Sequence, residues 1–249
     1  MTVTKPPAKP GLAAYLYAIY AWTTFILCLT PALLSATVLP GLERRRHWVS
    51  VFARTFFRLA GIGVTVRGLE NLPAEHCVVV ANHASYLDGP ILQAWLPPRF
   101  SYVIKSEMQK VPLAGFMLNR IGSRFVERFV KSASARDARN LMRAANNGEA
   151  LGFFPEGTFR PEPGLGRFHS GAFLSAIKSS IPIVPVVIRG SRQILPSGTM
   201  LASRGKLEID ILQPIGPEDP AFASARVLST HARERILSVL DEPDLGATG

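Results

Sequence analysis

A stretch without a single charged side chain, residues 11–42, lies near the start of this 249-residue chain. Within it, residues 12–30 come close to the ~20 apolar residues that cross the hydrocarbon core of a bilayer. Pro31 then interrupts the apolar run. Three interpretations stay open: a single transmembrane helix, a segment that dips into one leaflet and kinks at Pro31, or a signal peptide with the basic N-terminus as its charged start.

The segment that follows is basic and amphipathic. Three consecutive arginines, residues 44–46, favour the cytoplasmic side of a membrane and attract anionic lipid headgroups. In residues 47–60, aromatic side chains recur at helical spacing on one face and basic side chains on the other. This pattern indicates a helix that lies in the membrane interface. It is also typical of an amphipathic helix packed on a domain.

The overall charge narrows the classes of partner. A net charge of +10 suits nucleic acid, an anionic membrane surface or a phosphorylated substrate. No helix-turn-helix, zinc-finger or aromatic RNA-binding signature is visible, which disfavours nucleic acid. Cys28 and Cys77 both lie in apolar stretches, which predicts buried free thiols. No cysteine or histidine cluster has the spacing of a metal site.

The short, β-branched run of residues 77–81 predicts a buried strand. The polar residues Asn82 and His83 follow it directly. Gly89-Pro90 indicates the first turn of a helix, so His83 is expected on a strand-to-helix loop. Asp88, near the helix start, can accept the proton of one ring nitrogen, and the other nitrogen can then take a proton from a hydroxyl. This is a Ser-His-Asp triad in which the substrate supplies the hydroxyl. A turn histidine beside a helix-capping aspartate fits the same residues.

Three further blocks accompany Asn82-His83 and Asp88, at residues 122–128 (GSRFVER), 151–160 (LGFFPEGTFR) and 181–190 (IPIVPVVIRG). Together, over roughly residues 66–214, they resemble the blocks of the lysophosphatidate (1-acyl-sn-glycerol-3-phosphate) acyltransferase family in the family's order. The chain departs from the family pattern at three positions. Glu127 replaces an aspartate, Phe159 occupies the usual arginine position, and His169 replaces a lysine.

The resemblance implies a set of site residues. The catalytic pair is His83 and Asp88, and the residues expected to bind substrate are Asn82, Lys105, Arg128, Glu156, Gly157, Thr158 and Arg160. The planar fork of Arg128 suits phosphate oxygens, and the backbone around Gly157 can approach a phosphate closely. Glu156 is expected either to bind the glycerol hydroxyls or to position the histidine loop. For the second block, the alternative is that Arg128 is a surface arginine paired with Glu127. For the third block, the alternative is an ordinary turn at the end of a strand.

Strands that alternate with helices predict an α/β sandwich with the motif loops at one end of the sheet. The resemblance implies a mixed, mostly parallel sheet flanked by helices. The expected organisation is a disordered N-terminus (1–10), a membrane-embedded or interfacial helical pair (11–60), a catalytic domain (61–240) and a loose C-terminus (241–249).

The function that the resemblance implies is acyl transfer from acyl-coenzyme A or acyl carrier protein to lysophosphatidate, giving phosphatidate in phospholipid biosynthesis. No cofactor or metal is expected, and the location is the cytoplasmic face of the inner cell membrane. Two alternatives stay open. One is the same chemistry on a lyso-ornithine lipid, another lysophospholipid or glycerol 3-phosphate. The other is a membrane-binding scaffold without turnover.

Overall fold

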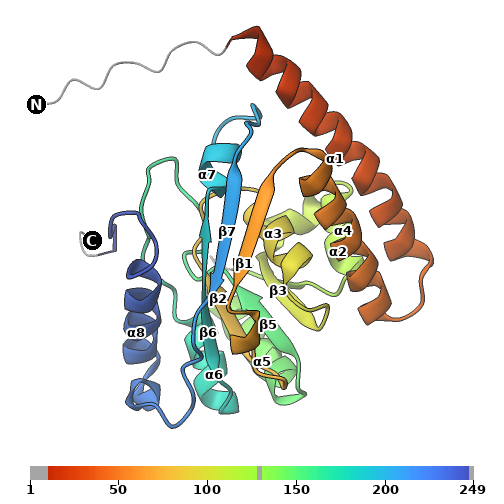
Figure 1. Cartoon of the computed structure of the whole chain (residues 1–249). Coiled ribbons are helices and arrows are strands. Elements are labelled where there is room, and N and C mark those ends of the chain that lie inside the picture. The colour runs from red at the N-terminus through yellow and green to blue at the C-terminus, as the bar shows by residue number, and fades with distance from the viewer. Residues whose placement is uncertain (1–10, 128–130, 247–249) are drawn as a thin grey trace, which may run out of the picture.

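The computed structural model describes residues 11–127 and 131–246, with side chains left out at 131–138. Two long helices, α1 (Leu12–Val38) and α2 (Leu42–Leu59), pack against each other on one side of the molecule (Figure 1). α1 continues through Pro31, and large apolar side chains such as Leu16, Ile19 and Leu27 are exposed along it. Among the described residues, α1 is the helix whose length and composition would allow it to cross a membrane.

α2 begins at Leu42, so the arginine cluster belongs to the helix. Arg46 was grouped with the residues expected to face lipid, but its side chain points inward and the residue is 4% exposed. Its guanidinium donates hydrogen bonds to the carbonyls of Ile121 (2.7 Å) and Arg99 (3.0 Å) and to the Ser101 hydroxyl (2.6 Å). A buried charge needs such partners. Arg46 therefore fastens the helix pair to the rest of the protein.

Seven strands form one sheet in the order β1-β7-β6-β2-β5-β3-β4. Every neighbouring pair is parallel except β6 and β7, which are antiparallel. This confirms the mixed, mostly parallel α/β sheet that the sequence predicts. The strands are β1 (Gly63–Arg67), β2 (Val78–Ala81), β3 (Phe100–Lys105), β4 (Arg124–Val126), β5 (Ala150–Phe153), β6 (Ile183–Arg189) and β7 (Lys206–Ile211).

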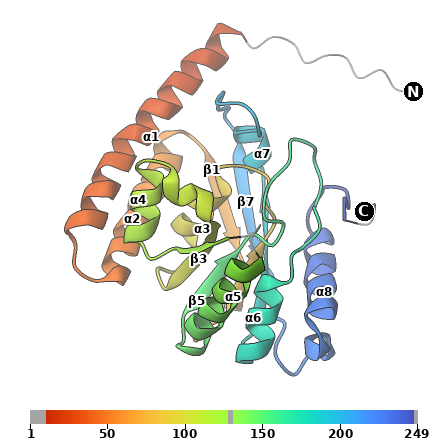
Figure 2. The same cartoon turned by 180° about the vertical axis from the view of Figure 1, so that it is seen from behind.

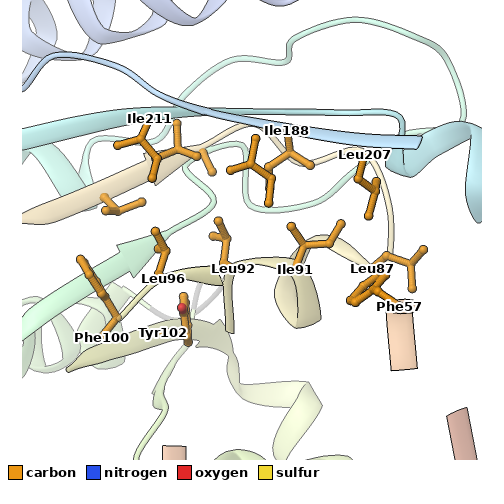
Figure 3. Close-up of a cluster of buried hydrophobic side chains, with 14 of the residues drawn as sticks. Phe57, Leu87, Ile91, Leu92, Leu96, Phe100, Tyr102, Ile188, Leu207 and Ile211 are labelled. Atoms are coloured by element: carbon orange, nitrogen blue, oxygen red, sulfur yellow. The ribbon is translucent and has the colours of Figure 1, made fainter. Parts of the chain in front are cut away.

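Helices cover both faces of the sheet, as the two opposite views in Figures 1 and 2 show. Because side chains alternate along a strand, Val79 of β2 joins the apolar cluster under α2 and α3, whereas Val80 joins the cluster under α5, α6 and α8. Figure 3 shows the first cluster, with Ile188 and Ile211 of the sheet opposite Leu92 of α3. The remaining helices are η1 (Leu69–Asn71), α3 (Asp88–Trp95), η2 (Ser106–Lys110), α4 (Ala114–Arg120), α5 (Lys131–Asn146), α6 (Gly171–Ser179), α7 (Ser191–Ile194), η3 (Pro220–Ala223) and α8 (Ala225–Leu237).

The order of the strands creates a topological switch point at the ends of β2 and β5. These two strands are parallel neighbours, but the chain leaves β2 toward β3 and leaves β5 toward β6, in opposite directions along the sheet. In open α/β sheets such a switch point, at the carboxyl ends of the strands, is where ligands bind. The loops that follow β2 and β5 carry the first and third sequence blocks.

β6 lies in the middle of the sheet, although its prolines predict a strand start. Pro185 pairs with Val80 of β2, and its carbonyl accepts the Leu212 N–H on the opposite side. The β7 ladder begins only at Val186. The missing N–H of Pro185 therefore falls on the side where no ladder bond is required, and the proline is tolerated within the strand.

The segment from residue 241 differs from the loose C-terminus that the sequence predicts. Within residues 241–246, the Pro243 carbonyl accepts the Leu165 N–H (2.9 Å) and the Leu245 N–H donates to the Leu165 carbonyl (3.0 Å). The expectation is wrong for these six residues, because their partner is a distant loop and local pattern gives no sign of it. Residues 1–10 and 247–249, also expected to be loose, lie outside the described residues.

Candidate active site

His83 and Asp88 meet across the loop between β2 and α3. The Nδ1 atom of His83 lies 2.9 Å from Oδ2 of Asp88. Asp88 is the first residue of α3, where the positive end of the helix dipole favours a carboxylate. With Nδ1–H donating to this carboxylate, the Nε2 atom is left as a proton acceptor. This is the arrangement that the five-residue spacing predicts.

The Asp88 carboxylate also shapes the loop that carries His83. Its Oδ2 atom accepts the backbone N–H groups of Ala84 (2.6 Å) and Ser85 (2.8 Å), and the residue is fully buried. Three donors on one oxygen stabilise the negative charge and leave the carboxylate little freedom to rotate. Asp88 therefore holds the imidazole and the backbone of its loop together within six consecutive residues.

Glu156 ties the turn after β5 to the histidine loop. Its Oε1 atom accepts the backbone N–H of His83, and its Oε2 atom accepts that of Gly166, each at 2.7 Å. Burial raises the pKa of this carboxyl group, although the two N–H donors act in the opposite direction. Of the two roles expected for Glu156, the geometry favours positioning the histidine loop, since both oxygens already have backbone partners.

Aromatic rings surround the imidazole of His83. Phe154 stacks on it with centroids 4.3 Å apart, and Phe159 meets it edge-on at 4.7 Å. Tyr86 contacts Phe159 in turn, again at 4.7 Å. The His83 side chain is 17% exposed. The rings thus cover much of the imidazole and restrict the approach of water to it.

The other residues that were expected to bind substrate include two with structural contacts, Asn82 and Gly157, and one exposed residue, Lys105. The Asn82 side chain is fully engaged with Ile188 of β6, donating to its carbonyl (2.9 Å) and accepting its N–H (2.7 Å). Gly157 closes the turn with φ +79°, and its N–H donates to the Phe154 carbonyl (3.0 Å). Lys105, at the end of β3, is exposed.

The charged and hydroxyl groups expected to hold phosphate lie at the surface or beyond the described residues. Thr158 and Arg160 are exposed on the loop after Glu156. Arg128 lies outside the described residues. The structure thus brings together His83, Asp88, Glu156 and Gly157, and it places Thr158 and Arg160 on the rim.

Sequence reasoning missed Gly166. A Cβ atom on this residue would lie 2.8 Å from Oε2 of Glu156, so the close approach of its N–H needs glycine. Its only sequence signal is the absence of a side chain in a loop rich in glycine and proline. Within residues 11–127 and 131–246, no group of three or more histidine, cysteine, aspartate or glutamate side chains is placed to hold a metal ion.

The structure thus places a His–Asp pair at the switch point of a mostly parallel α/β sheet, the place where proteins of this class bind their ligands. A family model described as "Acyltransferase" matches residues 63–189. The chain belongs to this acyltransferase family.

Several relatives extend the match beyond that segment. A 1-acyl-sn-glycerol-3-phosphate acyltransferase of Saccharomyces cerevisiae is 31% identical, over 81% of this chain and 68% of the relative. A lyso-ornithine lipid O-acyltransferase of Pseudomonas aeruginosa is 29% identical, over 82% and 81%. A chloroplastic 1-acyl-sn-glycerol-3-phosphate acyltransferase of Brassica napus is 30% identical over 76% of this chain, and the match spans about half (53%) of that longer protein.

The fold has a counterpart among solved structures. The crystal structure of the 1-acyl-sn-glycerophosphate acyltransferase of Thermotoga maritima superimposes with a TM-score of 0.77. The superposition covers 92% of this chain and 95% of the other at 23% sequence identity. This likeness includes the N-terminal helices as well as the sheet, because it covers nearly all of both chains.

Proposed function

We propose that the protein transfers a fatty acyl group from an acyl thioester to the free hydroxyl of lysophosphatidate, giving phosphatidate. The observation that carries the proposal is the His83–Asp88 contact of 2.9 Å, which holds Nδ1 and leaves Nε2 free. The relatives named as 1-acyl-sn-glycerol-3-phosphate acyltransferases support this choice of acceptor. The donor is acyl-coenzyme A or the acylated form of acyl carrier protein.

The reaction follows from the geometry. Nε2 of His83 takes the proton of the acceptor hydroxyl as its oxygen attacks the thioester carbonyl carbon. The carbon–sulfur bond then breaks, and the departing thiolate receives the proton back from the imidazolium. Asp88 stabilises the imidazolium while it exists. A positioned general base of this kind contributes about 10²–10⁴-fold to the rate.

An apolar cavity of about 100 Å³ lies beside the histidine loop and supports a lipid substrate. Tyr86 and Leu87 of that loop line it together with Tyr17 and Trp22 of α1. The cavity therefore joins the candidate active site to the helix whose apolar side chains are exposed.

We also propose that α1 and the outer face of α2 seat the protein in the cytoplasmic leaflet of the inner cell membrane. Exposed apolar side chains occur along α1 and at Trp48 and Leu59 of α2. Exposed arginines at residues 44, 54 and 58 flank them and suit anionic headgroups.

A second candidate acceptor is a lyso-ornithine lipid or another lyso-lipid. Phe159, where the family pattern has an arginine, contacts the catalytic imidazole, so the inner site carries a ring in place of a charge. Arg160, one residue later, is exposed. The lyso-ornithine lipid O-acyltransferase relative is consistent with such an acceptor.

The test is a thiol-release assay on detergent-solubilised protein with acyl-coenzyme A or acyl carrier protein and a panel of lyso-acceptors. Release that needs the lysophosphatidate phosphate and is lost in His83→Ala supports the first acceptor. Release with lyso-ornithine lipid and little with lysophosphatidate supports the second. Lipid binding without thiol release for any pair of substrates would contradict acyl transfer and support the scaffold alternative.

A further inference from the structure

The β5–α6 loop, residues 154–170, brings Glu156, Phe159 and Gly166 to the histidine loop. It has no helix or strand of its own apart from one bridge at Leu165. A segment of this length loses much conformational entropy when it adopts one shape, so it needs contacts from outside. Those contacts come from α7, from α8 and from residues 241–246, the C-terminal strap.

One ion pair contacts the loop at two places. Arg192 of α7 binds Glu242 of the strap with two parallel contacts of 3.1 Å, and its Nη1 atom donates to the Arg160 carbonyl at 2.5 Å. Glu242 in turn accepts the Gly164 N–H at 2.7 Å. The two side chains are only 11% and 17% exposed, so the pair is shielded from solvent and its geometry is fixed by both partners.

The strap also pairs with the loop through backbone. Leu165 exchanges two hydrogen bonds with strap residues Pro243 and Leu245, and its side chain is fully buried. Arg233 of α8 binds Asp244 and donates to the carbonyls of Leu165 (2.8 Å) and Gly166 (3.1 Å). The next contact along the loop is the N–H of Gly166 on Glu156, which holds the N–H of His83.

We propose that Arg192 and Glu242 are positioning residues of the active site, and that the C-terminal strap sets the orientation of His83 through the β5–α6 loop. Two routes connect them to the imidazole. One runs from the Arg160 carbonyl to the neighbouring ring of Phe159, which contacts His83. The other runs from Gly164 through Gly166 to Glu156. A displacement of about 1 Å at a reacting group can lower the rate about a hundredfold.

Glu242→Gln tests this proposal because it keeps the size of the side chain and removes its charge. Arg67→Gln is the matched control, since Arg67 forms ion pairs with Glu208 and Asp210 at the β1–β7 edge and does not contact the loop. We expect Glu242→Gln to lower kcat about tenfold or more with little change in KM for the acyl donor. Arg67→Gln should leave both within twofold.

A second readout does not depend on turnover. The imidazole NMR signals of His83, assigned by comparison with His83→Gln, should shift in Glu242→Gln and stay in place in Arg67→Gln. The kinetic readout rests on the proposed function, whereas this one does not. If no acceptor supports thiol release, the proposed function fails and the His83 signal alone decides the positioning role. An unmoved signal overturns it.

A double-mutant cycle with Phe159→Ala separates positioning from a general loss of stability. If the strap acts through the loop, the two substitutions are non-additive, and Glu242→Gln costs less in the Phe159→Ala background. Fully additive losses overturn the route through Phe159, and equal losses in Arg67→Gln overturn the proposal as a whole. Should Glu242→Gln not fold, Asp244→Asn releases the same strap from Arg233 and is measured in its place.

Discussion

The carboxylate of Glu156 accepts the backbone N–H of His83 at 2.7 Å, so the turn after β5 holds the loop after β2. The two residues are 73 positions apart in the chain, and they meet because β2 and β5 are parallel neighbours. His83 thus receives its orientation from two directions, from Asp88 through the ring and from Glu156 through the backbone.

Asp88→Asn should lower kcat about a thousandfold while the protein stays folded. The amide cannot stabilise an imidazolium, and its N–H₂ favours the tautomer that lacks a free Nε2 lone pair. Thiol-release kinetics and a thermal melt measure the two effects. Asp219→Asn is the control, because that carboxylate also accepts a backbone N–H at a helix start. Similar kinetic losses in both variants would contradict the assigned pair.

Gly166→Ala should lower kcat about tenfold. The new methyl group would lie 2.8 Å from Oε2 of Glu156, so either the carboxylate or the loop must move. Gly171→Ala is the matched control, since a Cβ atom there meets no atom within 4 Å. If the two variants have the same kcat, the contact between Gly166 and Glu156 does not position His83.

The raised pKa of Glu156 predicts a pH dependence of stability with a definite sign. Above its ordinary value of 4.5, the native carboxyl group retains a proton that the unfolded chain has already lost. The contribution of this group to the free energy of unfolding therefore falls as pH rises through that window. Urea unfolding measured from pH 4.5 upward should show a smaller decrease in Glu156→Gln than in the wild type. The exposed Glu162→Gln is the control, and equal slopes in all three proteins would contradict the expectation.

Arg46→Met should destabilise the protein by about 2 kcal/mol or more. The substitution keeps the volume of the side chain and leaves the carbonyls of Ile121 and Arg99 without their donor in a buried place. Urea unfolding in detergent measures the loss. Arg44→Met, an exposed position on the same helix, should change stability by less than about 0.5 kcal/mol. Comparable losses would show that Arg46 does not fasten the helix pair.

Residue patterns alone predict the part of the site that is local in the chain, whereas the role of Glu156 in positioning the histidine loop was expected only from the family resemblance. His83 and Asp88 are five positions apart, and a strand end followed by a helix start is enough to bring them together. Asn82 was grouped with the substrate ligands, but its amide pairs with Ile188, 106 positions away, and only the order of the strands reveals that partner. Arg46 was expected to be exposed like Arg44, because helical periodicity does not show which backbone carbonyls of other segments lie against the helix.

The C-terminal strap is a second case in which contacts distant in the chain could not be predicted from the sequence. Residues 241–246 have no periodic apolar pattern, and their order depends on ion pairs with Arg192 and Arg233. Such pairs join segments that are adjacent only once the sheet has formed. The fold class was predictable because the alternation of strands and helices recurs along the whole chain. Each of these ion pairs depends on single residues, and no recurring pattern marks them.

Phe159→Arg should move the preference of the enzyme toward acceptors that carry a phosphate. Phe159 lies 4.7 Å from the His83 ring, so a guanidinium there would stand beside the site of proton transfer. A charge-assisted hydrogen bond to a phosphate contributes about 1.5–3 kcal/mol, which corresponds to roughly a tenfold or greater rise in the kcat/KM ratio of lysophosphatidate to lyso-ornithine lipid. Phe159→Leu removes the ring without adding charge and should leave this ratio within about threefold. An equal change of the ratio in both variants would mean that the ring, and not the missing charge, sets the choice of acceptor.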